Sequence, residues 1–189
     1  MYRDGERVEK DFKVSVEWFQ RAADQGDADA QFNLGCMYRN GDGVEKDLKV
    51  SVEWFQRAAD QGYANAQYSL GCMYRDGKGV DKDLNISVKW FQRAADQGYA
   101  SAQNILGNMY RNGEGVDKDL NISVEWFQRA ADQGYADAQY RLGYMYRDGE
   151  GVDKDLKVSM EWFQRAADQG HANAQHALEY IYIIGEGAD

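Results

Sequence analysis

Proline is absent from this chain of 189 residues, and cysteine and histidine occur only twice each. Basic residues are in the minority, since 22 lysines and arginines face 32 acidic residues and give a formal net charge of -10. This shortage of positive charge argues against a nucleic acid or an anionic membrane as the partner. No apolar run approaches the roughly 18 residues that a membrane-spanning helix needs, and residues 1–12 lack the apolar core of a signal peptide. We therefore expect a cytoplasmic chain without membrane insertion.

The chain consists of one unit that recurs along its whole length. Its tryptophans, one leucine and one tyrosine recur every 36 residues, at Trp18, Trp54, Trp90, Trp126 and Trp162, at Leu34, Leu70, Leu106, Leu142 and Leu178, and at Tyr2, Tyr38, Tyr74, Tyr110, Tyr146 and Tyr182. Such a period is typical of an array in which every unit buries its apolar face on its neighbours. We predict a single solenoid domain over residues 1–189, with a partial first repeat at 1–26, full repeats at 27–62, 63–98, 99–134 and 135–170, and a partial last repeat at 171–189. Because both ends fall inside a repeat, we expect a fragment or a trimmed version of a longer array.

Each unit predicts a pair of helices, as residues 27–62 illustrate. Small and apolar residues between Ala28 and Gly41 have the three-and-four spacing of one helix face, and we name this segment helix A. Asp47 offers a side-chain oxygen to cap a second segment, helix B, which is apolar on more than one side and ends near Gly62. A helix of that kind is buried between others, with its tryptophan in the core. The predicted fold class is all-α, a right-handed α-solenoid of antiparallel helix pairs in 36-residue repeats.

The recurring residues also carry a resemblance. The pattern Ala-x-Ala-Gln-x-x-Leu-Gly-x-Met-Tyr-x-x-Gly-x-Gly-Val-x-x-Asp, followed by Trp-x-x-x-Ala-Ala-x-x-Gly, resembles the Sel1-like repeat, a relative of the tetratricopeptide repeat, over essentially the whole chain. The resemblance implies an adaptor that holds proteins or peptides together, and it implies neither an enzyme nor a cofactor. Arg7 departs from it by replacing a loop glycine, and Glu179 by replacing a helix A glycine. Serine replaces the usual alanine of helix B, a change that costs little if the hydroxyl bonds back to the helix, at Ser15, Ser51, Ser87, Ser123 and Ser159.

Comparison of the units separates packing positions from a candidate binding surface. Several helix A positions vary among units and lie about one turn apart, so they make one stripe, which lines the concave groove in tetratricopeptide-like stacks. Aromatic and amide groups alternate there, which suits a peptide partner. The helix A stripe, as we call it, supplies the predicted partner-binding residues Asp29, Phe32, Cys36, Arg39, Tyr68, Cys72, Arg75, Asn104, Asn108, Arg111, Tyr140, Tyr144, Arg147, His176 and Tyr180.

The arginine of this stripe does not vary among the units, and it has two interpretations. A row of guanidinium groups can clamp the carboxylates, phosphates or carbonyl groups of a ligand. Alternatively, each arginine pairs with an acid on a neighbouring helix, such as Asp29 or Asp76, and holds the stack together.

The sequence offers little catalytic or metal-binding chemistry. Cys36 and Cys72 occupy the same position of successive repeats, so a helix spacing of ~8–10 Å separates them beyond the ~7 Å limit of a disulfide. We expect free thiols. The two histidines, His171 and His176, lie far from both thiols and are not three or four residues apart on one helix, so neither a catalytic base nor a metal pair is predicted.

We therefore predict a non-catalytic scaffold that binds a protein or peptide, with no cofactor, metal or nucleic acid. Two alternatives remain open. One is a structural array that self-associates end to end through uncapped ends. The other, suggested by cysteine-rich relatives of the repeat, is a hydrolase of the penicillin-binding or β-lactamase type, which needs a nucleophile and a base in one pocket.

Overall fold

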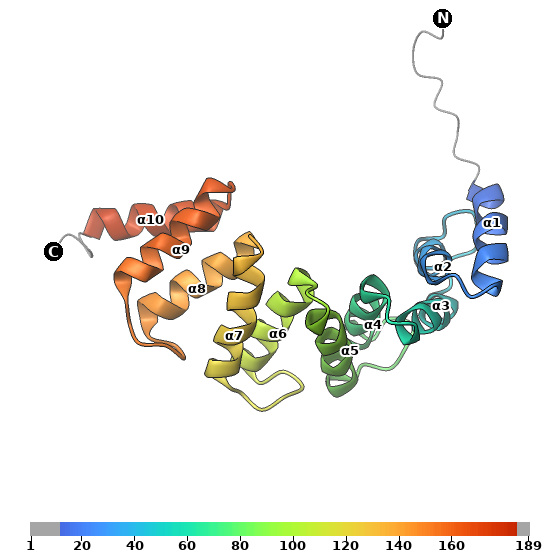
Figure 1. The fold of residues 1–189 in the computed structure, drawn as a ribbon, viewed down its shortest axis with the longest axis horizontal. Coiled ribbons are helices and arrows are strands. Elements are labelled where there is room, and N and C mark those ends of the chain that lie inside the picture. Colours follow the sequence, from blue (N-terminus) through green and yellow to red (C-terminus); the bar gives the residue numbers. More distant parts are fainter. Residues whose placement is uncertain (1–11, 185–189) are drawn as a thin grey trace, which may run out of the picture. The chain divides into compact units, whose positions relative to one another are not determined.

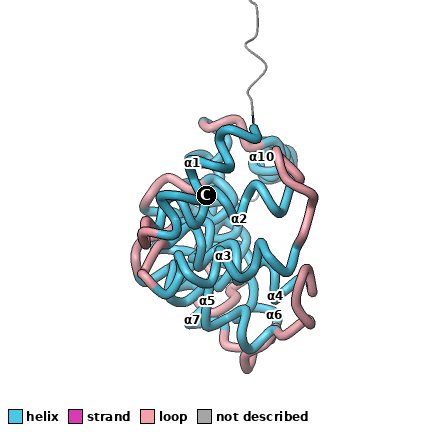
Figure 2. The backbone as a smooth tube through the Cα atoms, turned by 90° about the vertical axis from the view of Figure 1, so that its right-hand side faces the viewer, coloured by secondary structure: helices cyan, strands magenta, loops and turns pink. Residues whose placement is uncertain are grey.

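The computed structural model describes residues 12–184, which form helices and connecting loops without a strand (Figures 1 and 2). The departure at Arg7 lies outside the described residues. Odd-numbered helices are of the helix B type and even-numbered helices of the helix A type, so the predicted all-α fold of helix pairs is confirmed. The helices are α1 (Phe12–Asp24), α2 (Ala28–Asn40), α3 (Leu48–Asp60), α4 (Ala64–Asp76), α5 (Leu84–Asp96), α6 (Ala100–Asn112), α7 (Leu120–Asp132), α8 (Ala136–Asp148), α9 (Leu156–Asp168) and α10 (Ala172–Ile184).

The helices fall into two compact units. The first runs to Asp83 and holds α1 to α4, and the second begins at Leu84 and holds α5 to α10. Within each unit the extensive contacts join helices that are consecutive in the chain, and the largest join a helix A to the helix B that follows it. Each unit is therefore built from local pairs.

The helix ends follow the predicted capping chemistry. The carboxylate of Asp47 accepts hydrogen bonds from the backbone N–H groups of Lys49 and Val50 at 2.9 and 3.1 Å, which confirms it as the cap of α3. Gly41 follows α2 in the left-handed region with φ 88°, as the spacing predicts. After α3, the N–H of Tyr63 bonds to the carbonyl of Ala58 at 3.1 Å, which closes the last turn.

Helices A and B of one repeat approach closely because a glycine and a serine face each other. A Cβ atom added to Gly35 would lie 2.5 Å from Cδ1 of Phe55, so a side chain at this position would collide with the buried ring. The hydroxyl of Ser51 donates to the carbonyl of Gly35 at 2.7 Å, and Ser123 and Ser159 make the same bond to Gly107 and Gly143. Ser51, Ser123 and Ser159 therefore bond to the neighbouring helix and not back to their own. Their hydroxyls reach across to helix A because the glycine leaves its carbonyl accessible.

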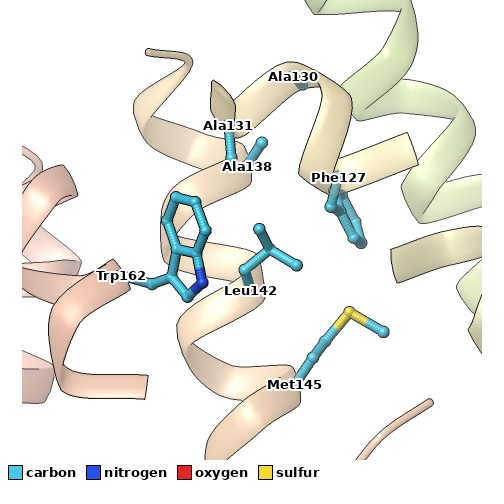
Figure 3. Packing of buried hydrophobic residues seen from close by; sticks show 7 residues of the cluster. All are labelled: Phe127, Ala130, Ala131, Ala138, Leu142, Met145 and Trp162. Carbon is cyan, nitrogen blue, oxygen red and sulfur yellow. The ribbon is translucent and has the colours of Figure 1, made fainter. Parts of the chain in front are cut away.

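The tryptophans of helix B lie in the core, with one exception. Trp54, Trp90, Trp126 and Trp162 are all buried, whereas Trp18 on α1 is 64% exposed, and no helix A precedes α1 among the described residues. Figure 3 shows one core cluster of the second unit, in which Trp162 of α9 faces Leu142 of α8. The buried members of this cluster are Phe127, Ala130, Ala131, Ala138, Leu142, Met145 and Trp162.

Candidate functional site

In the first unit, the helix A stripe comprises residues of α2 and α4, most of them partly buried. The ring of Phe32 lies 5.5 Å from that of Phe55 and 5.3 Å from that of Tyr63. Asp29 accepts a hydrogen bond of 2.6 Å from the hydroxyl of Tyr63, so this carboxylate is already engaged by the next repeat. Asp29 and Phe32 of α2 are thus already in contact with Tyr63, which precedes α4, and Phe32 also contacts Phe55 of α3.

The two thiols of the first unit are free, and burial raises the pKa of both. The charge of Arg39 acts in the opposite direction on Cys36, and Arg75, with a smaller contribution from Arg39, does so on Cys72. Because Arg39 of α2 influences Cys72 of α4, the stripes of these two helices face a common region. A raised pKa keeps a thiol protonated at neutral pH, which is the opposite of nucleophile activation.

In the second unit, stripe residues of α8 and α10 surround an open pocket of about 200 Å³. Its lining includes Tyr140, Tyr144, Arg147, Asn173, His176 and Tyr180. The rings of Tyr140 and Tyr144 meet edge to face at 4.9 Å, and the guanidinium of Arg147 lies 4.2 Å above the ring of Tyr144. Burial, together with hydrogen bonding to Tyr144, raises the pKa of Tyr140 to about 12. The structure therefore brings five predicted site residues together in one place.

The remaining predicted residues of this unit lie on α6. Asn108 donates its amide to the backbone carbonyl of Asn104 at 2.9 Å, and the side-chain oxygen of Asn104 is buried without a hydrogen-bond partner among the described residues. Arg111 donates from Nε to Oε2 of Glu150 at 2.9 Å, so it is tied to the loop that follows α8.

The stripe arginines do not form one uniform row of ligand-binding groups. Arg75 pairs with Asp76 at 2.9 Å and Arg147 with Asp148 at 2.7 Å, in each case the next residue of the same helix. Arg111 pairs with Glu150 at 2.8 Å. Acids therefore hold three of these arginines. Asp76 and Asp148 are acids of the Asp76 type that the sequence suggested, but each lies on the same helix as its arginine and not on a neighbouring helix.

A glutamine network that sequence reasoning missed joins successive repeats. The buried Gln31 donates to the carbonyl of Ala23 at 3.1 Å and accepts from Gln61 at 2.7 Å. Gln103 and Gln139 do the same in the second unit. The signal was present in the invariant glutamine of the repeat pattern, although its partners lie on other helices.

Metal and membrane chemistry find little support in residues 12–184. No group of three or more potential metal ligands occurs in this range. His171 contacts Asp137 through Nε2 at 3.0 Å, and His176 lies 3.4 Å from Glu179. None of the described helices is long and apolar enough to cross a membrane.

A sequence profile decides the family. The profile of the Sel1 repeat matches residues 1–27, 28–63, 64–99, 100–135 and 136–171. The chain belongs to the Sel1 repeat family. Sel1 repeats are commonly protein-interaction scaffolds and are generally non-catalytic. No curated protein matches the chain significantly.

Solved structures resemble this chain to different degrees. The protective antigen c5321 of uropathogenic Escherichia coli is 41% identical, with a TM-score of 0.91 over 93% of this chain and 38% of its own. A Sel1 repeat protein of Oxalobacter formigenes is 34% identical, with a TM-score of 0.83 over 95% of this chain and 71% of its own. The immunity protein Pa5087 of Pseudomonas aeruginosa is 26% identical, with a TM-score of 0.54 over 89% of this chain and 62% of its own. This Sel1 repeat chain therefore spans less than half the length of c5321.

Proposed function

We propose that this chain is a non-catalytic Sel1 repeat scaffold that binds a protein or peptide on its helix A stripe. The observation that carries the proposal is the pocket between α8 and α10, where stripe residues of successive repeats come together around one open space. Tyr140, Tyr144 and Tyr180 line it with aromatic surface, and Arg147, Asn173 and His176 supply polar groups. Tyrosine and arginine are enriched at the centres of protein interfaces because they combine apolar area with hydrogen-bonding groups.

The form of the stripe supports a peptide ligand over a reacting substrate. Most side chains of the stripe are partly buried. A bound peptide therefore removes the remaining water from aromatic rings that are already partly shielded from it. A hydrolase with a thiol nucleophile needs a lowered thiol pKa, whereas burial raises the pKa of Cys36 and Cys72. The family membership points the same way.

A selection from a displayed peptide library on the intact chain tests the proposal. Binding of a selected peptide to Tyr68→Ala and Tyr140→Ala should weaken by roughly tenfold or more, because truncation of an aromatic anchor at an interface costs over 1 kcal/mol. The matched controls are Glu53→Ala and Glu125→Ala, which change exposed residues of helices B. Each control should bind as the parent does.

The opposite pattern would contradict the proposal. If Glu53→Ala or Glu125→Ala abolishes binding while both tyrosine variants bind normally, the partner covers helix B and the stripe is not the site. The end-to-end array is a separate outcome, which light scattering reveals as a particle mass that grows with protein concentration.

A further inference from the structure

The four arginines of the helix A stripe differ in the residue that follows them. Arg75 and Arg147 precede an aspartate, and each guanidinium is neutralised by that aspartate within its own helix, at 2.9 and 2.7 Å. Arg39 and Arg111 precede Asn40 and Asn112, which carry no charge. Two of the four arginines must therefore find a carboxylate elsewhere or remain without one.

Arg111 finds its carboxylate in the next repeat. Its Nε and Nη2 atoms lie 2.9 and 2.8 Å from Oε2 of Glu150, which is 39 residues further along the chain. The equivalent position for Arg39 is occupied by Lys78. The second unit therefore has a glutamate, Glu150, at the position where the first unit has a second cation, Lys78.

Arg39 is left with weak contacts. Its Nε lies 3.5 Å from Oδ1 of Asn40, its Nη2 lies 3.8 Å from Sγ of Cys36, and its guanidinium lies 5.7 Å from the ring centre of Phe55. No carboxylate lies within ion-pair distance of it among residues 12–184. A guanidinium has five N–H donors, so most of its hydrogen-bonding capacity is unused and faces solvent.

The neighbouring charges reinforce this local preference for an anion. Arg75 and Lys78 share the single carboxylate of Asp76, at 2.9 and 3.1 Å. Asp42, the acid nearest to Arg39 in the sequence, already accepts a hydrogen bond of 3.0 Å from Asn40. A site rich in cations stands out in a chain whose formal net charge is -10.

We propose that Arg39 is the anion-binding point of the helix A stripe and receives a carboxylate group of the bound peptide. The group is either an acidic side chain or the C-terminal carboxylate, since both present the same two oxygens to the planar guanidinium fork. Phe32 and Tyr68 lie on the same stripe and offer aromatic surface to the residues beside that carboxylate. This inference rests on the proposed function, and it fixes the register in which a peptide lies on the first unit.

The repeats themselves supply variants that neutralise Arg39. Asn40→Asp copies the aspartate that follows Arg75, and Lys78→Glu copies the glutamate that holds Arg111. Both place a residue where another repeat of the same chain already holds it, so the fold should be retained. Lys49→Glu is the matched control for Lys78→Glu, because it makes the same charge change of two units at an exposed position of α3.

Three probe peptides separate the sources of the carboxylate. The first, acetyl-Gly-Glu-Phe-Glu-Gly-amide, carries carboxylates only in its side chains, and the second, acetyl-Gly-Gln-Phe-Gln-Gly with a free C-terminus, carries one only at its end. The amide of the second peptide is the neutral probe. Each is titrated into the intact chain labelled with ¹⁵N, and the Nε–Hε signal of Arg39 and the backbone amide signals are followed.

We expect at least one carboxylate probe to shift the Arg39 signal and to bind at least tenfold more tightly than the neutral probe. Asn40→Asp and Lys78→Glu should each weaken that probe about tenfold, while Lys49→Glu should change its affinity by less than twofold. The inference is overturned if the neutral probe shifts the backbone amide signals of α2 and α4 and binds as tightly as both carboxylate probes. That outcome leaves the proposed function standing. Probe-induced shifts confined to the exposed face of helices B would instead contradict the proposed function.

Discussion

At the scale of single residues, Tyr140 shows how burial and a neighbour on the same helix set the chemistry of a side chain. Its ring lies 4.6 Å from that of His171 and 5.9 Å from that of the buried Phe163. Burial and the hydrogen bond to Tyr144 both favour the neutral phenol, which raises its pKa. Among the equivalent residues of other repeats, Tyr68 also carries a phenol, whereas Phe32, Asn104 and His176 do not.

The titration of Tyr140 gives a direct test. The pKa of Tyr140 is raised from the ordinary 10 to about 12, so the unfolded chain loses this proton at a lower pH than the folded chain does. The stabilising contribution is complete below pH 10 and disappears as the pH rises through 12. We expect the difference in phenolate absorbance between the parent and Tyr140→Phe to have its midpoint near 12. A midpoint near 10 would show that the phenol is neither buried nor bonded as described.

The sequence predicts local roles of residues better than it predicts their distant partners. The cap at Asp47 and the stop at Gly41 follow from residue type and position alone, and both are confirmed. The partners of Ser51 and Gln31 lie 16 and 8 residues earlier on a different helix, so the period shows that these residues matter but not what they touch. For the stripe, the period finds the arginines, whereas their pairing depends on whether Asp76 or Asn40 comes next.

At the scale of one helix, α1 and α3 separate sequence from environment. Their sequences differ only at the first residue, which is Phe12 in α1 and Leu48 in α3. Even so, Trp18 is 64% exposed and Trp54 is 8% exposed. Burial of helix B therefore depends on the helices packed against it, which no property of the helix itself can predict. The prediction that this tryptophan is buried holds for α3 and fails for α1 for that reason.

The same pair of helices provides a matched stability test. Trp54→Ala should lower the free energy of unfolding by about 3–5 kcal/mol, because it leaves a cavity in the core that Trp54 forms with Leu34 and Met37. Trp18→Ala removes an exposed side chain from a nearly identical helix and should cost less than about 1 kcal/mol. Chemical denaturation followed by circular dichroism measures both. Equal losses for the two variants would mean that Trp18 is packed as Trp54 is.

At the scale of the whole molecule, stability is the sum of many similar local contacts. Within each unit the extensive contacts join consecutive helices, as expected for a repeat array whose energy resides in nearest neighbours. The 36-residue period predicts this construction and the family, because every unit repeats the same packing residues. The occupant of the helix A stripe is not encoded in that way, since a ligand is selected by the positions that differ from unit to unit.

Local damage should therefore remain local, and Gly107 offers the means to test this. A Cβ atom at Gly107 would lie 2.6 Å from Cδ1 of Phe127, so Gly107→Ala forces α6 away from α7 at a cost of about 1–3 kcal/mol, although alanine is the better helix former. In native-state hydrogen exchange, amides of α6 and α7 should lose protection, while those of α2 and α3 in the other unit should change far less. Glu125→Ala, an exposed change on α7, should leave both regions as they are in the parent. A uniform loss of protection over both units would instead show that the chain opens as one cooperative body, and the nearest-neighbour description would be wrong.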